Sequence, residues 1–143
     1  MPQLAYHEHG RDGASKAKPL FWMGSTRKDL KAFPAGVRQA VGFALFQAQL
    51  GRKHVDAKVL KGFGGAGVLE VMSDFDGDTY RTVYTVKFAG AVYALHAFQK
   101  KSKKGIKTPP IELDIVRKRL KAAEEHHAKR RAEENQGRGP SHH

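Results

Sequence analysis

Between residues 68 and 99 the apolar residues recur with a period of two, and turn signals divide this stretch into three segments. The middle segment is rich in Tyr, Thr and Val, which favour strands. Asp76-Gly77 is a strong signal for a hairpin, and Ala89-Gly90 turns the chain again. Successive strands with such short connections pair side by side, so the sequence predicts a three-stranded antiparallel meander. The expected strands are 68–72, 79–88 and 91–99.

The segment before the meander predicts one short strand and a helical hairpin. Residues 20–23 are apolar and long enough for one strand. Ser25 or Thr26 can cap a short first helix, and Pro34 suits the first turn of a second helix that runs to about Leu50. The second helix has a core stripe at helical spacing, formed by Val37, Val41, Ala44, Leu45 and Ala48.

A last helix follows the meander. Thr108 can cap it, with Pro109 and Pro110 at its start, and its pattern ends near Arg131. The predicted order is β-α-α-β-β-β-α, an α+β domain with helices on one face of a small antiparallel sheet. Its expected apolar stripe consists of Ile111, Ile115, Val116 and Leu120.

The length of 143 residues suits one domain. We expect this domain to span residues 19–131, between a flexible arm at 1–18 and a disordered tail at 132–143. The chain has no cysteine, which excludes disulfides, zinc–thiolate sites and cysteine nucleophiles. No apolar run approaches the roughly 18 residues of a membrane span, and the N-terminus lacks the pattern of a signal peptide. These features predict a soluble, cytoplasmic protein with no membrane partner.

The positive charge is concentrated in one part of the chain. There are 26 Lys and Arg residues against 14 Asp and Glu residues, a formal charge of +12. Residues 100–131 hold 12 basic and 4 acidic side chains, a net of +8. Such a field attracts polyanions, and RNA is the partner that this distribution favours. The alternative is an ordinary solvated helix with surface lysines.

Two motif matches do not have the context that their chemistry needs. Residues 62–67 match GxGxxG, but they precede a strand, whereas a dinucleotide site needs the glycines to follow a strand and open a helix. Asp74, Asp76 and Asp78 resemble the start of a calcium loop without its closing Glu. We therefore expect no cofactor and no metal.

The third predicted strand carries the candidate site. Alternation puts His96, Phe98 and Lys100 on one face, where a ring can stack on a base and a cation can meet a phosphate. Histidine can also transfer a proton near neutral pH. The alternative is a hydrogen-bonded His96 partly covered by the last helix. Arg81, in the middle strand, needs water, a ligand phosphate or a carboxylate, and a cross-strand pair with Glu70 is the structural alternative.

Four segments of the chain resemble the RelE/HigB-like toxins, most closely their phage-derived HigB-like branch. The resemblance covers roughly residues 19–120 and is most specific between Tyr93 and Lys104. The segments that carry it are Lys58-Val59-Leu60-Lys61-Gly62, Thr79-Tyr80-Arg81-Thr82-Val83-Tyr84, Val92-Tyr93-Ala94-Leu95-His96-Ala97-Phe98-Gln99-Lys100-Lys101-Ser102 and Thr108-Pro109.

This resemblance implies the toxin of a type II toxin–antitoxin pair. Such a toxin would be an endoribonuclease that cleaves mRNA on the ribosome by metal-independent attack of the ribose 2′-hydroxyl. Its partners would be mRNA, the ribosome and a cognate antitoxin protein. The ParE branch shares the fold and poisons DNA gyrase, so a non-catalytic toxin or a plain RNA-binding module is the competing hypothesis.

The resemblance also implies roles for particular residues. Arg81 and Lys100 would bind the scissile phosphate, and His96 would be the general acid or base. Lys61 would assist deprotonation of the nucleophile or anchor RNA. Phe98 or Tyr84 would stack a base. Further RNA contacts are expected from Lys58, Lys101, Lys103 and Lys104.

Overall fold

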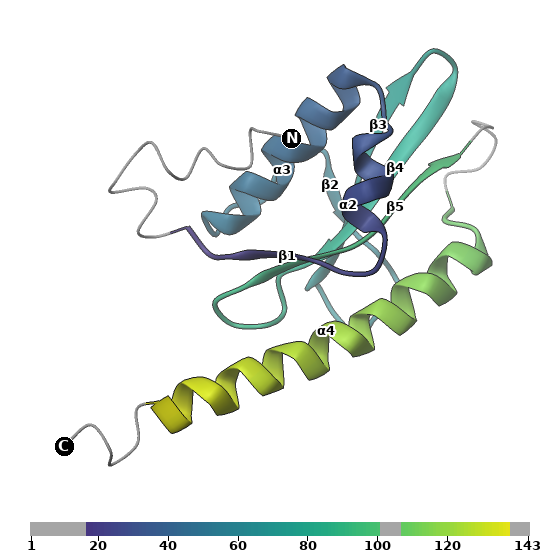
Figure 1. Cartoon of the computed structure of the whole chain (residues 1–143). Helices are drawn as coiled ribbons and strands as arrows, with labels where there is room; N and C mark the ends of the chain where they lie inside the picture. Colours follow the sequence, from purple (N-terminus) through teal and green to yellow (C-terminus); the bar gives the residue numbers. More distant parts are fainter. Residues whose placement is uncertain (1–16, 101–106, 138–143) are drawn as a thin grey trace.

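The computed structural model describes residues 17–100 and 107–137, and it forms one sheet with helices on both sides (Figure 1). No helix in these ranges is long and apolar enough to cross a membrane. The elements are β1 (Leu20–Trp22), α2 (Thr26–Lys31), α3 (Ala35–Gln49), β2 (Ala57–Val59), β3 (Val68–Phe75), β4 (Asp78–Thr85), β5 (Val92–Lys100) and α4 (Pro110–Gly137).

The sheet has five strands in the order β1-β5-β4-β3-β2, which confirms the predicted α+β class. The meander of β3, β4 and β5 is antiparallel, as the alternation and turns predict. The prediction missed β2, because a strand of three residues has too few positions to show a period. It also described the sheet as antiparallel throughout, whereas β1 pairs with β5 in the parallel direction.

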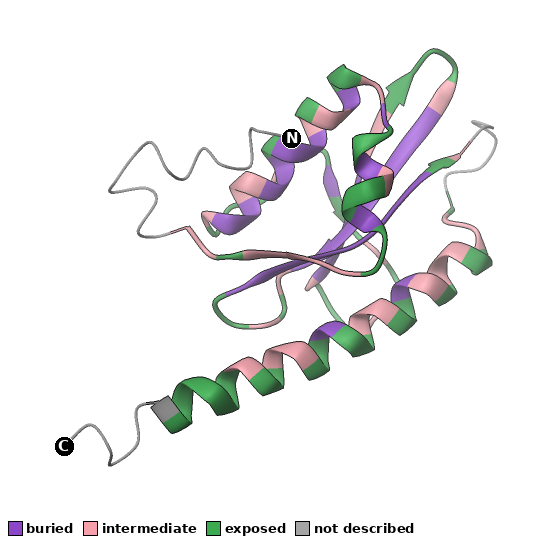
Figure 2. Ribbon diagram, in the orientation of Figure 1, coloured by how far each residue is buried: buried purple, intermediate pink, exposed green. Residues whose placement is uncertain are grey.

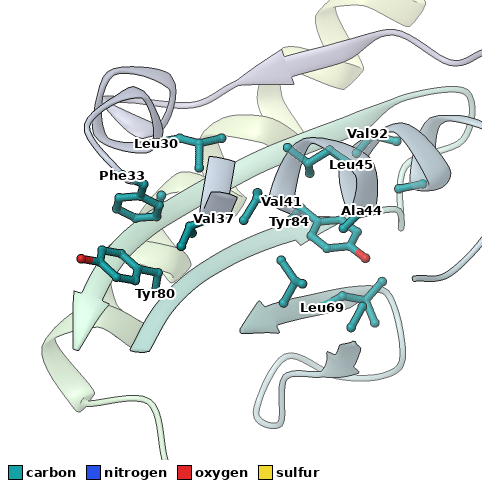
Figure 3. Close-up of a cluster of buried hydrophobic side chains, with 14 residues drawn as sticks. Leu30, Phe33, Val37, Val41, Ala44, Leu45, Leu69, Tyr80, Tyr84 and Val92 are labelled. Atoms are coloured by element: carbon teal, nitrogen blue, oxygen red, sulfur yellow. The ribbon is translucent and has the colours of Figure 1, made fainter. Parts of the chain in front are cut away.

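The two halves of the sequence cover opposite faces of the sheet. Helices α2 and α3 pack on one face, in a cluster that includes Val41, Leu45 and Tyr84 (Figure 3). Helix α4 packs on the other face through Val116 and Ala123. The expectation of helices on one face only is therefore wrong. Its physical cause is visible in β4 and β5, which are buried along most of their length (Figure 2) and so need cover on both sides.

Helix α4 differs from its prediction at both ends. Ile111, expected in the apolar stripe, is exposed, and the helix continues to Gly137, beyond Arg131. Its second half is held by His126, whose Nδ1 lies 2.8 Å from the hydroxyl oxygen of Tyr93. The guanidinium of Arg130 lies 4.8 Å from the centre of the Phe21 ring. Polar and aromatic contacts thus continue the attachment of α4 where its apolar stripe ends.

Candidate nucleic-acid interface

The strand register brings four of the predicted site residues onto the sheet face that α4 covers. Arg81 is paired with Phe98 across the β4–β5 ladder. His96 and Lys100 lie two residues before and after Phe98 on β5. Directly paired residues point to the same face of a sheet, and so do residues two apart on one strand. The predicted common face for His96, Phe98 and Lys100 is therefore present, with Arg81 beside them.

Arg81 is buried and paired with a carboxylate. Its side chain is 3% exposed, and Nη1 lies 3.6 Å from Oε1 of Glu70. Thr108, just before α4, accepts a hydrogen bond from Nη1 of Arg81 at 3.5 Å and donates one to Oε2 of Glu70 at 2.9 Å. The structure therefore has the cross-strand pair with Glu70, which the sequence left open as the alternative to a phosphate ligand.

Burial raises the pKa of Glu70 above its ordinary value, and three neighbours oppose this effect. The hydrogen bond from Thr108 and the positive charges of Arg81 and Lys100 all favour the ionised carboxylate. The raised pKa means that desolvation outweighs these attractions. The carboxylate therefore depends on its neighbours to stay charged in the folded protein.

His96 is also buried, and both of its ring nitrogens have neighbours on α4. The residue is 5% exposed. Nε2 lies 2.7 Å from Oε1 of Glu112, and Nδ1 lies 3.3 Å from Nη1 of Arg119. Arginine can only donate, so Nδ1 accepts and Nε2 carries the proton that it donates to Glu112. In this arrangement His96 is the hydrogen-bonded histidine of the structural alternative, with no free nitrogen for a substrate.

Arg119 joins α4 to two other parts of the chain. Besides His96, its Nη1 donates to the carbonyl oxygen of Leu95 at 3.1 Å and to Oγ1 of Thr26 at 3.2 Å. Its Nη2 donates to Oγ of Ser25 at 3.1 Å. Gly24 makes room for this guanidinium, because a Cβ there would lie 2.5 Å from Nε of Arg119. Gly24 also has a φ of 56°, which other residues rarely adopt.

Phe98 has one side covered by a neighbouring ring. Its ring stacks on that of His96, with centroids 5.1 Å apart and planes at 23°. The residue is 8% exposed. The structure therefore brings Phe98 to the expected face but leaves no open ring surface for a base. A stacking role would require α4 and His96 to move away from it.

Tyr84 lies on the opposite face of the sheet, so its expected role in RNA stacking is wrong. It is fully buried in the cluster beneath α3 (Figure 3), opposite Leu69 of β3. Burial raises the pKa of Tyr84 to about 12. Its hydroxyl oxygen has no hydrogen-bonding partner among the described residues. Tyr84 is thus a core residue whose buried hydroxyl lowers the stability of the fold.

Replacement of Tyr84 by phenylalanine is expected to leave the free energy of unfolding within about 1 kcal/mol of the wild type, or to raise it. The ring keeps its packing, and the removed hydroxyl makes no hydrogen bond within the described chain. Urea unfolding measures the change. A loss of several kcal/mol would contradict this account, and a loss of RNA binding without a loss of stability would restore Tyr84 to the interface.

The accessible cations of the candidate interface are lysines. Lys58 is exposed and lies opposite Glu70 in the β2–β3 register, which puts it on the α4 face. Lys61 is exposed in the turn after β2. Lys100 is half-buried at the end of β5, where Nζ donates to the carbonyl oxygen of Lys107 at 3.2 Å. The other expected RNA contacts, Lys101, Lys103 and Lys104, lie outside the described residues.

The prediction did not single out Glu112 and Arg119 as site residues. One signal was present for Arg119, which lies three residues after Val116 and four before Ala123. Those two positions are the buried face of α4, so an arginine between them has to reach polar partners. Nothing comparable in the sequence identifies Glu112, whose partner lies 16 residues away on another element.

Comparisons with known proteins show what this chain is similar to. The model of the phage-derived protein Gp49-like family (DUF891) matches residues 28–121. A chain from the crystal structure of the RelBE2 toxin–antitoxin complex of Mycobacterium tuberculosis superposes with a TM-score of 0.41 and 22% sequence identity. That match covers 60% of this chain and 94% of the other. No curated protein matches the sequence significantly.

Proposed function

This chain belongs to the phage-derived Gp49-like family, and we propose that it is the toxin of a type II toxin–antitoxin pair, of the RelE/HigB-like kind. The family match covers residues 28–121, which include every residue of the candidate interface. The motifs from Lys58 to Pro109 that resemble these toxins fall within the same range. The antitoxin would be a protein that neutralises the basic surface.

The proposed activity is cleavage of mRNA on the ribosome. The 2′-hydroxyl oxygen of one nucleotide would attack the adjacent phosphorus, and the 5′-oxygen of the next nucleotide would leave with a proton. The products would be a 2′,3′-cyclic phosphate and a 5′-hydroxyl end. Catalysis then consists of orienting the nucleotide, moving two protons and stabilising charge on the phosphate. The observation that carries this proposal is the common sheet face of Arg81, His96, Phe98 and Lys100.

The accessible lysines support an entry point for RNA at one end of this face. Lys100 would meet the scissile phosphate first, and Lys58 and Lys61 would hold the strand from the rim beside β2. In the structure Thr108 hydrogen-bonds to Arg81 and Glu112 hydrogen-bonds to His96, so neither side chain is open to a substrate. A catalytic role for either residue therefore requires the first turns of α4 to leave the sheet when RNA binds on the ribosome.

The burial of Arg81 and His96 favours a second candidate. A toxin that only binds its target, as in the gyrase-poisoning ParE branch, needs the charge but no open catalytic group. A plain RNA-binding module would have the same requirement. Mapping of mRNA 5′ ends separates cleavage from both, and trapping of gyrase–DNA complexes identifies the first of them.

Replacement of Lys100 by alanine is expected to reduce mRNA cleavage by about 10-fold to 100-fold, because one charge beside the scissile phosphate is lost. The assay is a translating extract in which 5′ ends are mapped by primer extension. Lys28→Ala is the matched control, since Lys28 is an exposed lysine on α2, across the sheet. Equal cleavage by both variants would contradict the role of Lys100. Intact mRNA with the wild type would contradict the nuclease itself.

A further inference from the structure

The described sheet has an edge at β2 that no strand covers. β2 is the last strand in the order, paired with β3 on one side only. The N–H of Leu60 donates to the carbonyl oxygen of Val68 at 2.9 Å. Inward and outward bonding alternate along an antiparallel strand, so the N–H and C=O of Val59 point away from β3. This edge can accept one more strand.

An apolar hollow lies beside the same edge. Val59 is 41% exposed and lines a cavity of about 290 Å³ between β2 and the end of α3. Ala48, Leu69 and Val86 form its apolar walls. The volume is enough for one apolar side chain from a partner. At the turn before β2, Val55 is 89% exposed, which adds apolar surface along the same edge.

The rim of the hollow is basic. Lys18, Arg52 and Lys53 line it, and Lys58 and Lys61 are exposed on β2 and in the turn that follows. Only one acidic residue, Asp56, lies between Gly51 and Gly62, and its carboxylate is 4.0 Å from the ring of His54. A partner with negative charges would be attracted to this edge, and a basic one would be repelled.

We propose that the β2 edge and the adjoining hollow are the docking surface for an extended acidic segment of the antitoxin, a partner whose existence rests on the proposed function. The segment adds a strand to β2, pairs with the outward backbone groups of Val59 and places an apolar side chain in the hollow. The carboxylates that alternate with this side chain point to the other face of the sheet, where Lys58 lies, and acidic residues that flank the strand meet Arg52 and Lys53 at the rim of the hollow. Such a segment also covers Lys58 and Lys61, so docking at this edge removes part of the proposed RNA surface.

The probe for this site is a short, capped synthetic peptide that alternates Glu and Val. A peptide with Lys in place of Glu is its counterpart. The full-length protein, labelled with ¹⁵N, is titrated with each peptide, and amide shifts and hydrogen exchange are recorded. The acidic peptide is expected to shift the Val59 amide and to slow its exchange by about 10-fold or more, and the basic peptide to do neither. Protection at other strands, or at none, would overturn the proposal.

Two sets of variants test the backbone and charge contributions separately. Val59→Pro removes the outward N–H and none of the β2–β3 bonds, and it should weaken binding of the acidic peptide by about 10-fold or more. Arg52→Glu with Lys53→Glu should weaken it by a similar factor. Lys28→Glu with Lys31→Glu, a pair of exposed lysines on α2, makes the same charge change elsewhere and should alter binding by about 2-fold or less. Equal losses in both double variants would mean attraction to the net charge alone and would overturn the docking site.

The peptide experiment is independent of RNA cleavage, so the two proposals fail separately. Protection of the Val59 amide in a protein that leaves mRNA intact would support the docking surface and count against the nuclease. Cleavage of mRNA by a protein whose Val59 amide is not protected by the peptide would support the nuclease and count against the docking surface. If Val59→Pro does not fold, the exchange measured on the wild-type protein still decides.

Discussion

Replacement of Glu70 by alanine is expected to lower the free energy of unfolding by about 3–5 kcal/mol. The change leaves Arg81 charged and buried, 3% exposed, without the carboxylate at 3.6 Å that now faces it. Thr108 would also lose the acceptor for its hydroxyl proton. Burying a guanidinium that has lost its carboxylate is costly, and this cost sets the size of the effect. Urea unfolding of the wild type and the variant measures it.

An exposed ion pair provides the control. Asp114→Ala breaks the pair between Asp114 and Arg117, whose Nη1 lies 3.0 Å from Oδ1 of Asp114 and whose side chain is 53% exposed. That change should cost about 0.5 kcal/mol or less. A similar small loss for Glu70→Ala would contradict the view that the buried pair is a strong local constraint.

A double replacement separates the stability of the pair from its function. Glu70→Leu with Arg81→Met removes both charges, and most of the stability lost in Glu70→Ala should return, because no buried charge is left without its counter-charge. If Arg81 binds phosphate during cleavage, this stable double variant should still be inactive. A stable and active double variant would restrict Arg81 to a structural role.

The meander could be predicted because period-two alternation and tight turns are local signals. The same alternation brought His96, Phe98 and Lys100 to one face correctly. It also contained the evidence against Tyr84, because residues three apart on a strand point to opposite faces, and Tyr84 lies three after Arg81. Choosing Tyr84 by residue type ignored this register, and its burial under α3 is the result.

The alternation along the strands does not show which element covers each face of the sheet. The cover comes from α4, and its contacts join residues 16 and 24 positions apart, such as His96 with Glu112 and Leu95 with Arg119. A basic helix far along the chain also has the composition of a solvated surface, so the sequence left the cover of His96 by this helix only as an alternative to an open face. β2 was missed for a related reason, since its pairing with β3 depends on tertiary contact rather than on its own three residues.

Replacement of Arg119 by alanine is expected to lower the free energy of unfolding by about 2–4 kcal/mol. One guanidinium donates to Ser25, Thr26 and the carbonyl of Leu95, and hydrogen bonds from a charged donor contribute about 1.5–3 kcal/mol each without being additive. The guanidinium also fills the space beside Gly24, where a Cβ would lie 2.5 Å from its Nε, so removal of the Arg119 side chain leaves a void. Urea unfolding gives the change in free energy.

Arg117→Ala is the matched control, because Arg117 lies on the same helix and has only surface contacts within the described chain, an exposed ion pair with Asp114 and a cation–π contact at 5.5 Å from the centre of the Phe63 ring. It should change stability by about 1 kcal/mol or less. In the Arg119 variant, loosening of α4 should also expose His96, so diethyl pyrocarbonate should modify this ring faster than in the wild type or in Arg117→Ala. Equal modification rates in all three proteins would mean that α4 stays on the sheet without Arg119. That result would mean that Arg119 does not control access to the sheet face where RNA is proposed to bind. Faster modification together with faster mRNA cleavage would instead identify movement of α4 as the step that opens this face.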